Sequence, residues 1–436
     1  MLIEFSVTNY RSFLTTQSLT LTANTATELQ EENSFVSPVS NLPHLLRSAV
    51  VYGPNAAGKS NLVQAIAFMK RFVLSSAKES QEGEKIDATP FLFNRQSSRN
   101  SSELEVLFIQ DGIRYQYGFA GNSERVTGEW LFAYPEGRAQ KWFERNYNPE
   151  TQKDIWYFGP KFTGRRKVWQ EATRSNALFL STAIQLNNEQ VKPVFNWFDH
   201  KLVVLAQGAS ISHGFSASEC EEEKKKMKIL KFMNAADLSI TDISLEKKEF
   251  SMDDLPPDMP QSIKEEIDRD LKGKKLTRLF FMHPSSDNGE DVALEFSEES
   301  AGTRKLFALA GPWLDVLDNG FVLFVDELDT SLHPIMVRFL LNLFHNPEAN
   351  QHNAQLVFTT HDTTVLDQTL MRRDQVWFVE KDAENATRLY PLSDYKPRKG
   401  EALQKGYLYG RYGALPFPGE LRFYGYRQSV SQEKRA

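Results

Sequence analysis

The eight residues GPNAAGKS at 53–60 constrain the fold of this chain more than any other segment. They fill every fixed position of the pattern G-x-x-x-x-G-K-S/T, which forms phosphate-binding loops between a strand and a helix. The short apolar run SAVVY precedes them, and NLVQAIAFMKRFVL follows with apolar residues at helical spacing. This order of strand, glycine-containing loop and helix predicts a phosphate-binding site rather than a turn before an ordinary helix.

Each fixed position of this loop has a chemical reason. Without a Cβ at Gly53 and Gly58, the backbone can fold around a phosphate and direct N–H groups toward it. The N-terminus of the following helix adds partial positive charge. Lys59 would reach the β- and γ-phosphates of a nucleotide, and the hydroxyl of Ser60 would ligate Mg²⁺. The predicted nucleotide-binding residues of this segment are Gly53, Pro54, Asn55, Ala56, Ala57, Gly58, Lys59, Ser60 and Asn61.

A second segment, FVLFVDELDTSLHP at 321–334, supplies the acidic residues that such a site needs. Asp326 follows five apolar residues typical of a buried strand, and it would hold the Mg²⁺ shell together with Ser60. The carboxylate of Glu327 could orient and deprotonate an attacking water. Acids at the end of a strand also cap helices in many α/β proteins. Because a P-loop is present in the same chain, we favour the metal-binding and general-base roles.

Composition excludes several other classes of protein. The single cysteine, Cys220, cannot form an internal disulfide, and no apolar stretch approaches the roughly 20 residues of a membrane span. The N-terminus lacks the basic start and apolar centre of a signal peptide. We therefore expect a cytoplasmic protein without membrane contact. The formal net charge of −6 argues against general coating of nucleic acid, although it leaves room for a local basic patch.

The chain of 436 residues is long enough for two or three folding units. Alternating or apolar runs predict strands near both ends of the chain, at 2–7, 18–23, 48–52, 321–325, 355–359 and 375–380. The middle of the chain has mixed short strands, a helical stretch at 176–198 and a loop at 253–262. We predict an α/β protein with an N-terminal half-domain at 1–120, an inserted lobe at 121–289 and a C-terminal half-domain at 290–436.

Four further motifs accompany the P-loop: NYRSF at 9–13, FSEESAGTRK at 296–305, DELDTSLHP at 326–334 and TTHD at 359–362. Together they resemble the ATP-binding-cassette (ABC) type of P-loop ATPase, a group that includes chromosome-maintenance ATPases and OLD-like anti-phage ATPases. In that group such motifs form the opening segment, the signature, the fused Walker B and D-loop, and the switch histidine. The resemblance covers about residues 1–120 and 290–436. It implies an ABC-type head assembled from N- and C-terminal segments, with an inserted α+β or helical lobe.

The resemblance also implies a composite site, in which two heads meet head to tail around ATP. Ser300 and Gly302 would then act on the γ-phosphate bound by the other head. His361 would sense the γ-phosphate, and Asp329 would be the D-loop acid. The catalytic residues implied are Glu327, His361 and Lys59. Ser300 could instead be a simple N-cap of the helix that begins there.

Two positions stay open at this stage. Arg11 of NYRSF either touches the nucleotide or stabilises the first hairpin. The group usually carries a glutamine on a loop after the P-loop helix, and here both Gln96 and Gln110 are candidates, while PFLF at 90–93 could replace it. The signature also lacks the double glycine of transporters, which favours the non-transporter branch.

The inserted lobe raises the question of partners. Its basic runs, GRRKVW at 164–169, KKKMKILK at 224–231 and LKGKKLTR at 271–278, would bind nucleic acid or simply form solvated helix faces. No D-x-D pair of the topoisomerase–primase nuclease type follows residue 380, so we expect the chain to lack its own nuclease. In this it resembles the RloA-, AriA- and PtuA-like ATPases of bacterial defence operons.

That resemblance implies a Mg²⁺-dependent ATP hydrolase that forms a homodimer or higher homo-oligomer and regulates a separately encoded effector. A nuclease is the expected effector, and DNA or a phage-encoded trigger is a further candidate partner. Two alternatives remain. One is a DNA-repair or chromosome-associated ATPase that binds DNA through its inserted lobe. The other is a nucleotide-gated scaffold that hydrolyses ATP slowly.

Overall fold

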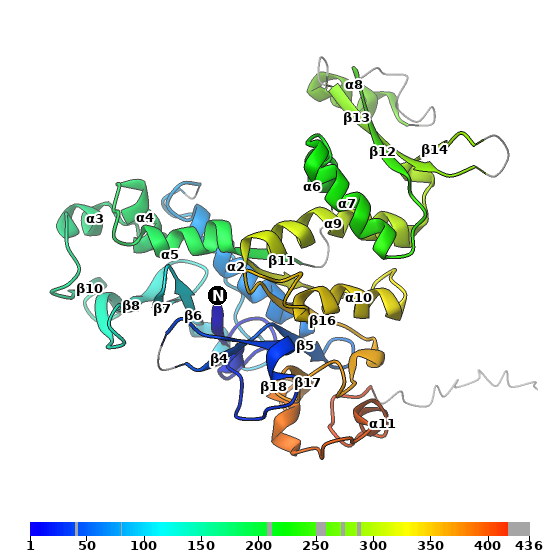
Figure 1. Cartoon of the computed structure of the whole chain (residues 1–436). Coiled ribbons are helices and arrows are strands. Elements are labelled where there is room, and N and C mark those ends of the chain that lie inside the picture. The colour runs from blue at the N-terminus through cyan, green and yellow to red at the C-terminus, as the bar shows by residue number, and fades with distance from the viewer. Residues whose placement is uncertain are drawn as a thin grey trace, which may run out of the picture.

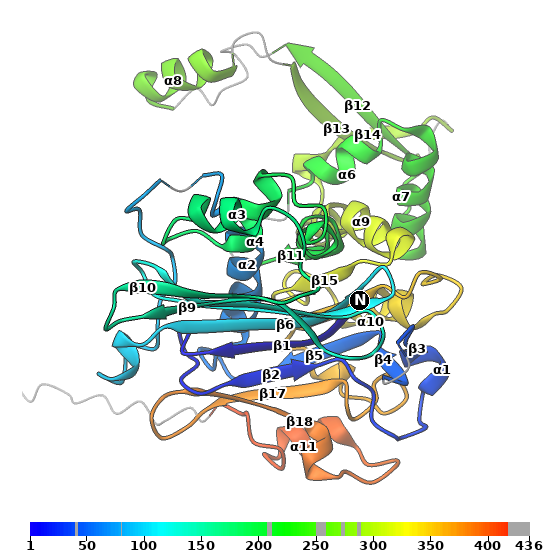
Figure 2. The ribbon, with the colours of Figure 1, turned by 90° about the vertical axis from the view of Figure 1, so that its left-hand side faces the viewer.

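The computed structural model of the chain describes residues 1–39, 42–79, 81–206, 212–249, 259–271, 275–285 and 289–416. Part of the predicted loop at 253–262 and part of the basic run at 271–278 lie outside these residues. Two large sheets dominate the described structure, and a smaller helical and three-stranded part projects from them (Figures 1 and 2). Within the described residues, no helix is long and apolar enough to cross a membrane.

The larger sheet has seven antiparallel strands in the order β10-β9-β8-β7-β6-β1-β2. Their bounds are β1 Leu2–Thr8, β2 Gln17–Thr20, β6 Ser102–Gln110, β7 Ile113–Gly121, β8 Val126–Tyr134, β9 Gln140–Asn148 and β10 Lys153–Phe158. Alternate residues of these strands are buried, as in β6, where Leu104, Val106 and Phe108 face the core. This alternation fits a sheet with one face packed against the rest of the protein and the other facing water.

The second sheet is mostly parallel and has the order β11-β15-β16-β5-β17-β18. Its strands are β5 Ser48–Tyr52, β11 Leu202–Leu205, β15 Val322–Val325, β16 Gln355–Thr359, β17 Val376–Lys381 and β18 Thr387–Pro391. β5, β15 and β16 are buried along their whole length, which explains why their sequences are mostly apolar rather than alternating. Because β5 pairs with both β16 and β17, the predicted α/β class and the assembly of the head from both ends of the chain are confirmed.

Two hydrophobic cores flank the parallel sheet. One contains Val51 and Val357 and extends across helix α2 (Lys59–Ser75) into the antiparallel sheet. The other contains Val50 and Phe358 and extends into helices α9 (Ala301–Asn319) and α10 (Pro334–His345). The parallel sheet therefore has apolar packing on both faces, and the loops after its strands meet along its carboxyl-terminal edge.

The smaller projecting part is formed by α6 (Gly214–Glu219), α7 (Glu223–Ala235), β12 (Asp242–Glu249), α8 (Gln261–Leu271), β13 (Lys275–His283) and β14 (Val292–Glu295). β12, β13 and β14 form an antiparallel sheet of their own. The layout differs from the expected boundaries at 120 and 289, because β8–β10 continue the large sheet and β11 joins the parallel sheet. β14 also pairs with β13 rather than with either large sheet. Strand pairing is not local in sequence, so these pairings could not be predicted from the sequence, and the division of the chain into three parts stays a prediction.

The remaining elements are short: α1 (Gln30–Asn33), β3 (Ser34–Val36), β4 (His44–Leu46), α3 (Arg166–Ala172), α4 (Phe179–Gln185), α5 (Lys192–Asn196) and α11 (Leu403–Leu408). The helical stretch predicted at 176–198 is thus divided into α4, α5 and the start of a π-helical turn at Trp197–Lys201. The strand predicted at 18–23 ends at Thr20.

Candidate nucleotide-binding site

The predicted phosphate-binding loop joins β5 to α2, as its sequence indicates. Gly58 has a φ of +117°, a conformation that side chains disfavour, and a Cβ there would lie 2.3 Å from the hydroxyl of Thr387 and 2.9 Å from that of Ser12. A Cβ on Gly53 would lie 2.4 Å from the carbonyl oxygen of Val379. Both fixed glycines are therefore required by close packing beneath the loop, in addition to any need to approach a phosphate.

We expect Gly58→Ala to weaken ATP binding at least about tenfold, because the methyl group would push the loop away from Thr387. Gly400 gives a matched control, since it also has positive φ (+80°) but nothing within 4 Å of the position that a methyl group would take. Gly400→Ala should keep the wild-type affinity, measured by titration calorimetry. Equal affinities of the two variants for ATP would show that the packing beneath Gly58 is not needed for binding.

Lys59 lies at the start of α2 and is only 5% exposed. Its Nζ donates to the carbonyl of Gly53 at 2.8 Å. Burial lowers the pKa of Lys59, and the carboxylates of Glu327, Asp326 and Asp329 oppose that shift. The structure thus brings the P-loop lysine into one electrostatic site with the acids that follow β15.

Thr359, the last residue of β16, holds both acids after β15. Its hydroxyl donates to Oδ1 of Asp326 at 2.6 Å and accepts the backbone N–H of Glu327 at 2.8 Å. Glu327 has a left-handed backbone with φ of 50°, which a residue with a side chain seldom adopts and which is common at functional sites. One buried hydroxyl therefore orients the carboxylate of Asp326 and fixes the backbone that carries the carboxylate of Glu327.

Thr359→Val should lower kcat for ATP hydrolysis about tenfold or more, since it keeps the side-chain shape but leaves the buried Oδ1 of Asp326 and the partly buried N–H of Glu327 without their partner. Thr182→Val is the matched control, because Thr182 is a buried threonine whose hydroxyl donates to the backbone carbonyl of Leu178 beside its own helix. Steady-state rates of ATP hydrolysis by both variants test this prediction. A Thr359→Val rate equal to that of Thr182→Val would mean that the hydroxyl does not position the acids.

Asp326, one of the two residues predicted to hold Mg²⁺, fits that ion. Its Oδ2 is buried and has no hydrogen-bond partner among the described residues, and the same is true of Oδ1 of Asp329, the D-loop acid. Buried carboxylate oxygens without donors are suited to a hard cation such as Mg²⁺. Asp326 and the hydroxyl of Ser60 would hold the ion, and its positive charge would neutralise part of the negative charge of the phosphates.

A hydrogen bond joins the D-loop to the segment that carries the switch histidine. Oδ2 of Asp329 accepts the backbone N–H of His361 at 3.2 Å. The hydroxyl of Thr330 lies 3.4 Å from Oε2 of Glu327. His361 itself is exposed and lies two residues after the end of β16. Glu327, Asp329 and His361 therefore lie together at the carboxyl-terminal edge of the parallel sheet.

The signature segment lies beside the D-loop of the same chain. A Cβ on Gly302 would lie 3.3 Å from the carbonyl oxygen of Ser331. Ser300 is the N-cap of α9, and its hydroxyl accepts the backbone N–H of Thr303 at 3.1 Å. Although it caps α9, Ser300 is exposed on the surface of its own chain. Its action on a nucleotide held by a second copy stays a prediction.

Residues of the opening motif NYRSF contact α2, the helix that follows the P-loop. The amide of Asn61 donates to the hydroxyl of Ser12 at 2.8 Å. Arg11 contacts the side-chain oxygen of Gln64 on α2, and its guanidinium lies 5.6 Å from the ring centre of Tyr10. These contacts join Arg11 to α2 and to the neighbouring Tyr10. Stabilisation of the first hairpin and contact with nucleotide both stay predictions for Arg11. In the loop itself, Pro54 is half-buried, Asn55 and Ala56 are exposed and Ala57 is buried.

The two candidate glutamines differ in setting. Gln96 is exposed on the segment between α2 and β6, and Gln110 donates to Asp111 at the β6–β7 turn. In PFLF, Phe91 is buried, and its N–H donates to the side chain of Asn9 at 3.2 Å. None of these contacts assigns the missing glutamine.

Sequence reasoning missed three residues that contact the predicted site: Thr387, Thr359 and Lys305. The hydroxyl of Thr387, on strand β18, donates to the backbone carbonyl of Ala57 at 2.6 Å. Nζ of Lys305 on α9 donates to the carbonyl of Glu327 at 3.3 Å. Thr359 opens the TTHD motif and Lys305 closes the signature segment, so both had a sequence signal, whereas Thr387 had none.

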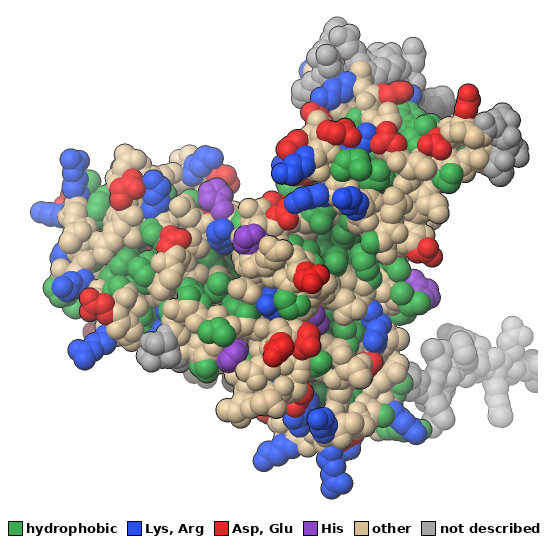
Figure 3. All heavy atoms as spheres, viewed as in Figure 1, with side chains coloured by type: hydrophobic (Ala, Val, Ile, Leu, Met, Phe, Trp, Pro, Cys, Tyr) green, Lys and Arg blue, Asp and Glu red, His purple; other side chains and the backbone are tan. Residues whose placement is uncertain are grey.

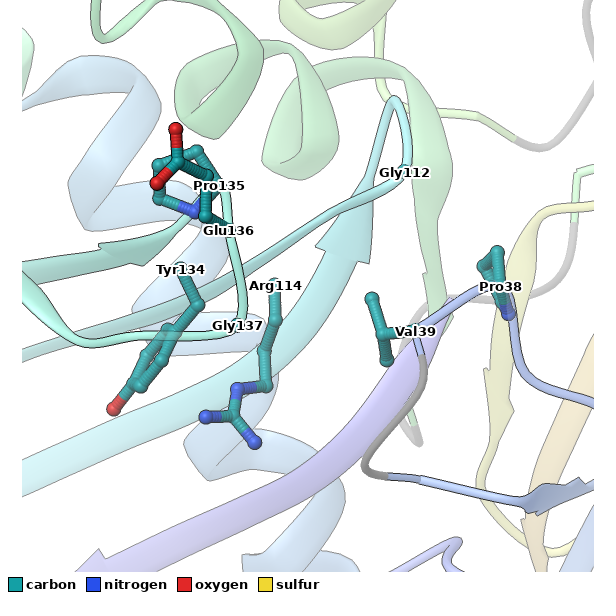
Figure 4. Close-up of a pocket in the computed structure, with 8 residues that line it drawn as sticks. All are labelled: Pro38, Val39, Gly112, Arg114, Tyr134, Pro135, Glu136 and Gly137. Atoms are coloured by element: carbon teal, nitrogen blue, oxygen red, sulfur yellow. The ribbon is translucent and has the colours of Figure 1, made fainter.

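A cavity of about 270 Å³ lies elsewhere, at the β6–β7 and β8–β9 turns (Figure 4). Its lining includes Gly112, Tyr134 and Arg114, whose guanidinium carbon lies 3.7 Å from the ring centre of Tyr134. No residue predicted to bind nucleotide lines this cavity. The phosphate-binding loop, and not this hollow, is therefore the candidate site.

A P-loop and an acid-bearing strand on one parallel sheet, together with a signature segment beside the D-loop, define an ABC-type P-loop ATPase head. A family model described as "AAA domain, putative AbiEii toxin, Type IV TA system" matches residues 48–195 and 242–367, more than half of the chain. The chain belongs to this family of AAA domains. No curated protein matches it.

Solved structures similar to this chain include chromosome-maintenance heads and a recombination protein. An SMC head bound to the C-winged helix domain of ScpA has 13% identity and a TM-score of 0.41, with 89% of this chain and 97% of that chain covered. The SMC head domain from Thermotoga maritima has 14% identity and a TM-score of 0.38 (89% and 98% covered). The recombination mediator RecF with ATP has 14% identity and a TM-score of 0.37 (90% and 99% covered).

Proposed function

We propose that this chain is a Mg²⁺-dependent ATP hydrolase that closes head to tail with a second copy around ATP. The observation that carries the proposal is the sheet order β15-β16-β5, which places the acids after β15 near the P-loop after β5, with Thr359 of β16 bonded to Asp326 and to the backbone of Glu327. Lys59 and Ser60 would bind phosphate and metal, Glu327 would take the proton of the attacking water, and His361 would lie beside the γ-phosphate.

Dimerisation is part of the proposal because each copy presents two complementary surfaces. The exposed Ser300 at the N-terminus of α9 offers free backbone N–H groups, which favour an anion such as the γ-phosphate. Gly302 lies against the D-loop at Ser331, so the signature and the D-loop would meet the second copy together. A two-fold arrangement would then form two equivalent nucleotide sites.

We further propose that this ATPase regulates a separately encoded effector, with a nuclease as the expected type, in defence against phage. The family description, which names a toxin of a type IV toxin–antitoxin system, supports a setting of this kind. Purified protein should hydrolyse ATP only with Mg²⁺, and light scattering should give a dimer only with ATP bound. Co-expression with neighbouring genes should recover the effector on the purified chain. Absence of ATP turnover would contradict the enzymatic part, and monomers at saturating ATP would contradict the dimer.

DNA binding through the inserted lobe has less support at the basic run 224–231, which lies in the projecting part. Within the basic run at 224–231, Lys225, Lys226 and Lys228 form ion pairs with Glu219, Asp242 and Asp318 at 2.8, 2.7 and 2.5 Å. Figure 3 shows acidic and basic side chains interspersed over this part of the surface. Lysines already paired with acids gain less from phosphate contacts. We therefore expect weak DNA binding that does not depend on these residues, measurable by fluorescence anisotropy at several salt concentrations.

A further inference from the structure

Lys305 connects the signature helix to the proposed general base of the same chain. It lies on α9, five residues after Ser300, and its Nζ donates to the carbonyl oxygen of Glu327 at 3.3 Å. Lys305 is half-buried. Burial lowers the pKa of Lys305, and the nearby carboxylates of Asp329 and Glu327 oppose the shift. The ammonium group thus lies among the acids of the site as well as against the backbone of Glu327.

The backbone of Glu327 needs such support. Its φ of 50° is a left-handed conformation, which is unfavourable for a residue with a side chain. The N–H of Glu327 donates to the hydroxyl of Thr359, and its carbonyl accepts from the N–H of Thr330 at 3.1 Å and from Lys305. Thr359 lies in the neighbouring strand β16 and Thr330 lies in the turn that follows Glu327, whereas Lys305 lies on α9.

We propose that Lys305 is a positioning residue for Glu327, which couples the helix behind the signature to the carboxylate that would activate water. The inference rests on the proposed function, because it assumes that Glu327 acts as the base. α9 is one continuous helix, so a displacement at Ser300 on contact with a second copy would move Lys305 as well. The signature of each copy would then adjust its own general base while it contacts the nucleotide of the other copy.

The chain offers a close control in Lys70. This lysine is also half-buried on a helix, α2, and its Nζ also donates to a backbone carbonyl, that of Leu202 in β11. Burial lowers the pKa of Lys70 too. It differs from Lys305 in its neighbours, which are Leu202 and Asp199 rather than the acids after β15. Loss of either amino group removes a comparable packing and hydrogen-bonding interaction.

The test compares kcat, KM for ATP and the melting temperature of the wild type with those of Lys305→Met, Lys305→Arg and Lys70→Met. Lys305→Met should lower kcat about tenfold to a hundredfold, since a small displacement of a catalytic group has effects of that size, with KM within about twofold. Lys305→Arg, which keeps the charge and the donor, should recover kcat to within about threefold, and Lys70→Met should keep the wild-type kcat. If Lys305→Met melts lower than Lys70→Met, Lys305→Gln takes its place, with the same loss of kcat expected.

The outcomes separate the inference from the proposed function. A wild-type protein that hydrolyses ATP, with Lys305→Met at the same kcat, would overturn the inference alone. A higher KM with unchanged kcat would also overturn it, because Lys305 would then bind ATP rather than position Glu327. A failure of Lys305→Arg to recover activity would count against it too, since a charged donor at this position would then not be what supports Glu327. A wild-type protein without ATP turnover would overturn the proposed function, and the inference with it.

Discussion

Glu327→Gln is expected to bind ATP with wild-type affinity and to hydrolyse it at least about a hundredfold more slowly. The amide keeps the size and polarity of the side chain but cannot take a proton from water. The backbone bonds that hold this residue, to Thr359 and Lys305, do not involve the carboxylate and should persist. Single-turnover hydrolysis and equilibrium binding of ATP measure the two properties separately.

Glu348→Gln serves as the control for this substitution, because Glu348 is an exposed acid in the turn after α10. Its hydrolysis rate should equal that of the wild type. If Glu327→Gln also hydrolyses ATP at the wild-type rate, another group must activate the water, and the role given to Glu327 is wrong. If instead it no longer binds ATP, the carboxylate serves binding rather than the chemical step.

Ser300→Arg is expected to abolish ATP-dependent dimerisation and to reduce hydrolysis to a comparable extent, while each chain still binds ATP. The arginine would replace an exposed N-cap at the surface where a second copy should meet α9, and it would add bulk at the site of the γ-phosphate. Loss of the cap itself costs typically about 1 kcal/mol of stability. Light scattering with and without ATP measures the assembly.

Ser300→Ala separates the two effects of that change. It removes the hydroxyl that accepts from Thr303 but adds no bulk, so it should lose stability by a similar amount and still allow dimers to form. A Ser300→Arg protein that dimerises normally and hydrolyses ATP would place the signature outside the contact between copies. The composite site would then be excluded.

Much of the fold and of the candidate site follows from local sequence patterns. The apolar run of β5 and the glycines after it predict a strand and a phosphate loop, because each depends on a few adjacent residues. Likewise the run before Asp326 predicts β15, and Ser300 predicts the start of α9. These elements occur where the sequence indicates them.

Features that depend on distant pairing could not be predicted in this way. β11 joins the parallel sheet beside β15, more than a hundred residues away in sequence, and nothing in its four residues specifies that partner. The packing of Thr387 beneath Gly58 likewise joins residues from the two ends of the chain. The contact of Lys305 with Glu327 depends on how α9 lies against β15 (Figure 2). Such contacts require the tertiary structure.

In the proposed dimer, each ATP is bound by the P-loop of one copy and closed over by the signature of another. Mixing two inactive proteins, Lys59→Met and Ser300→Arg, tests this composite site most directly. Neither variant can close a site with a second copy of itself, whereas a dimer with one chain of each kind combines an intact P-loop with an intact signature at one of its two sites. The mixture should therefore regain ATP hydrolysis, up to about half of the wild-type rate. A mixture as inactive as its two components, under conditions where the wild type hydrolyses ATP as a dimer, would contradict the composite site.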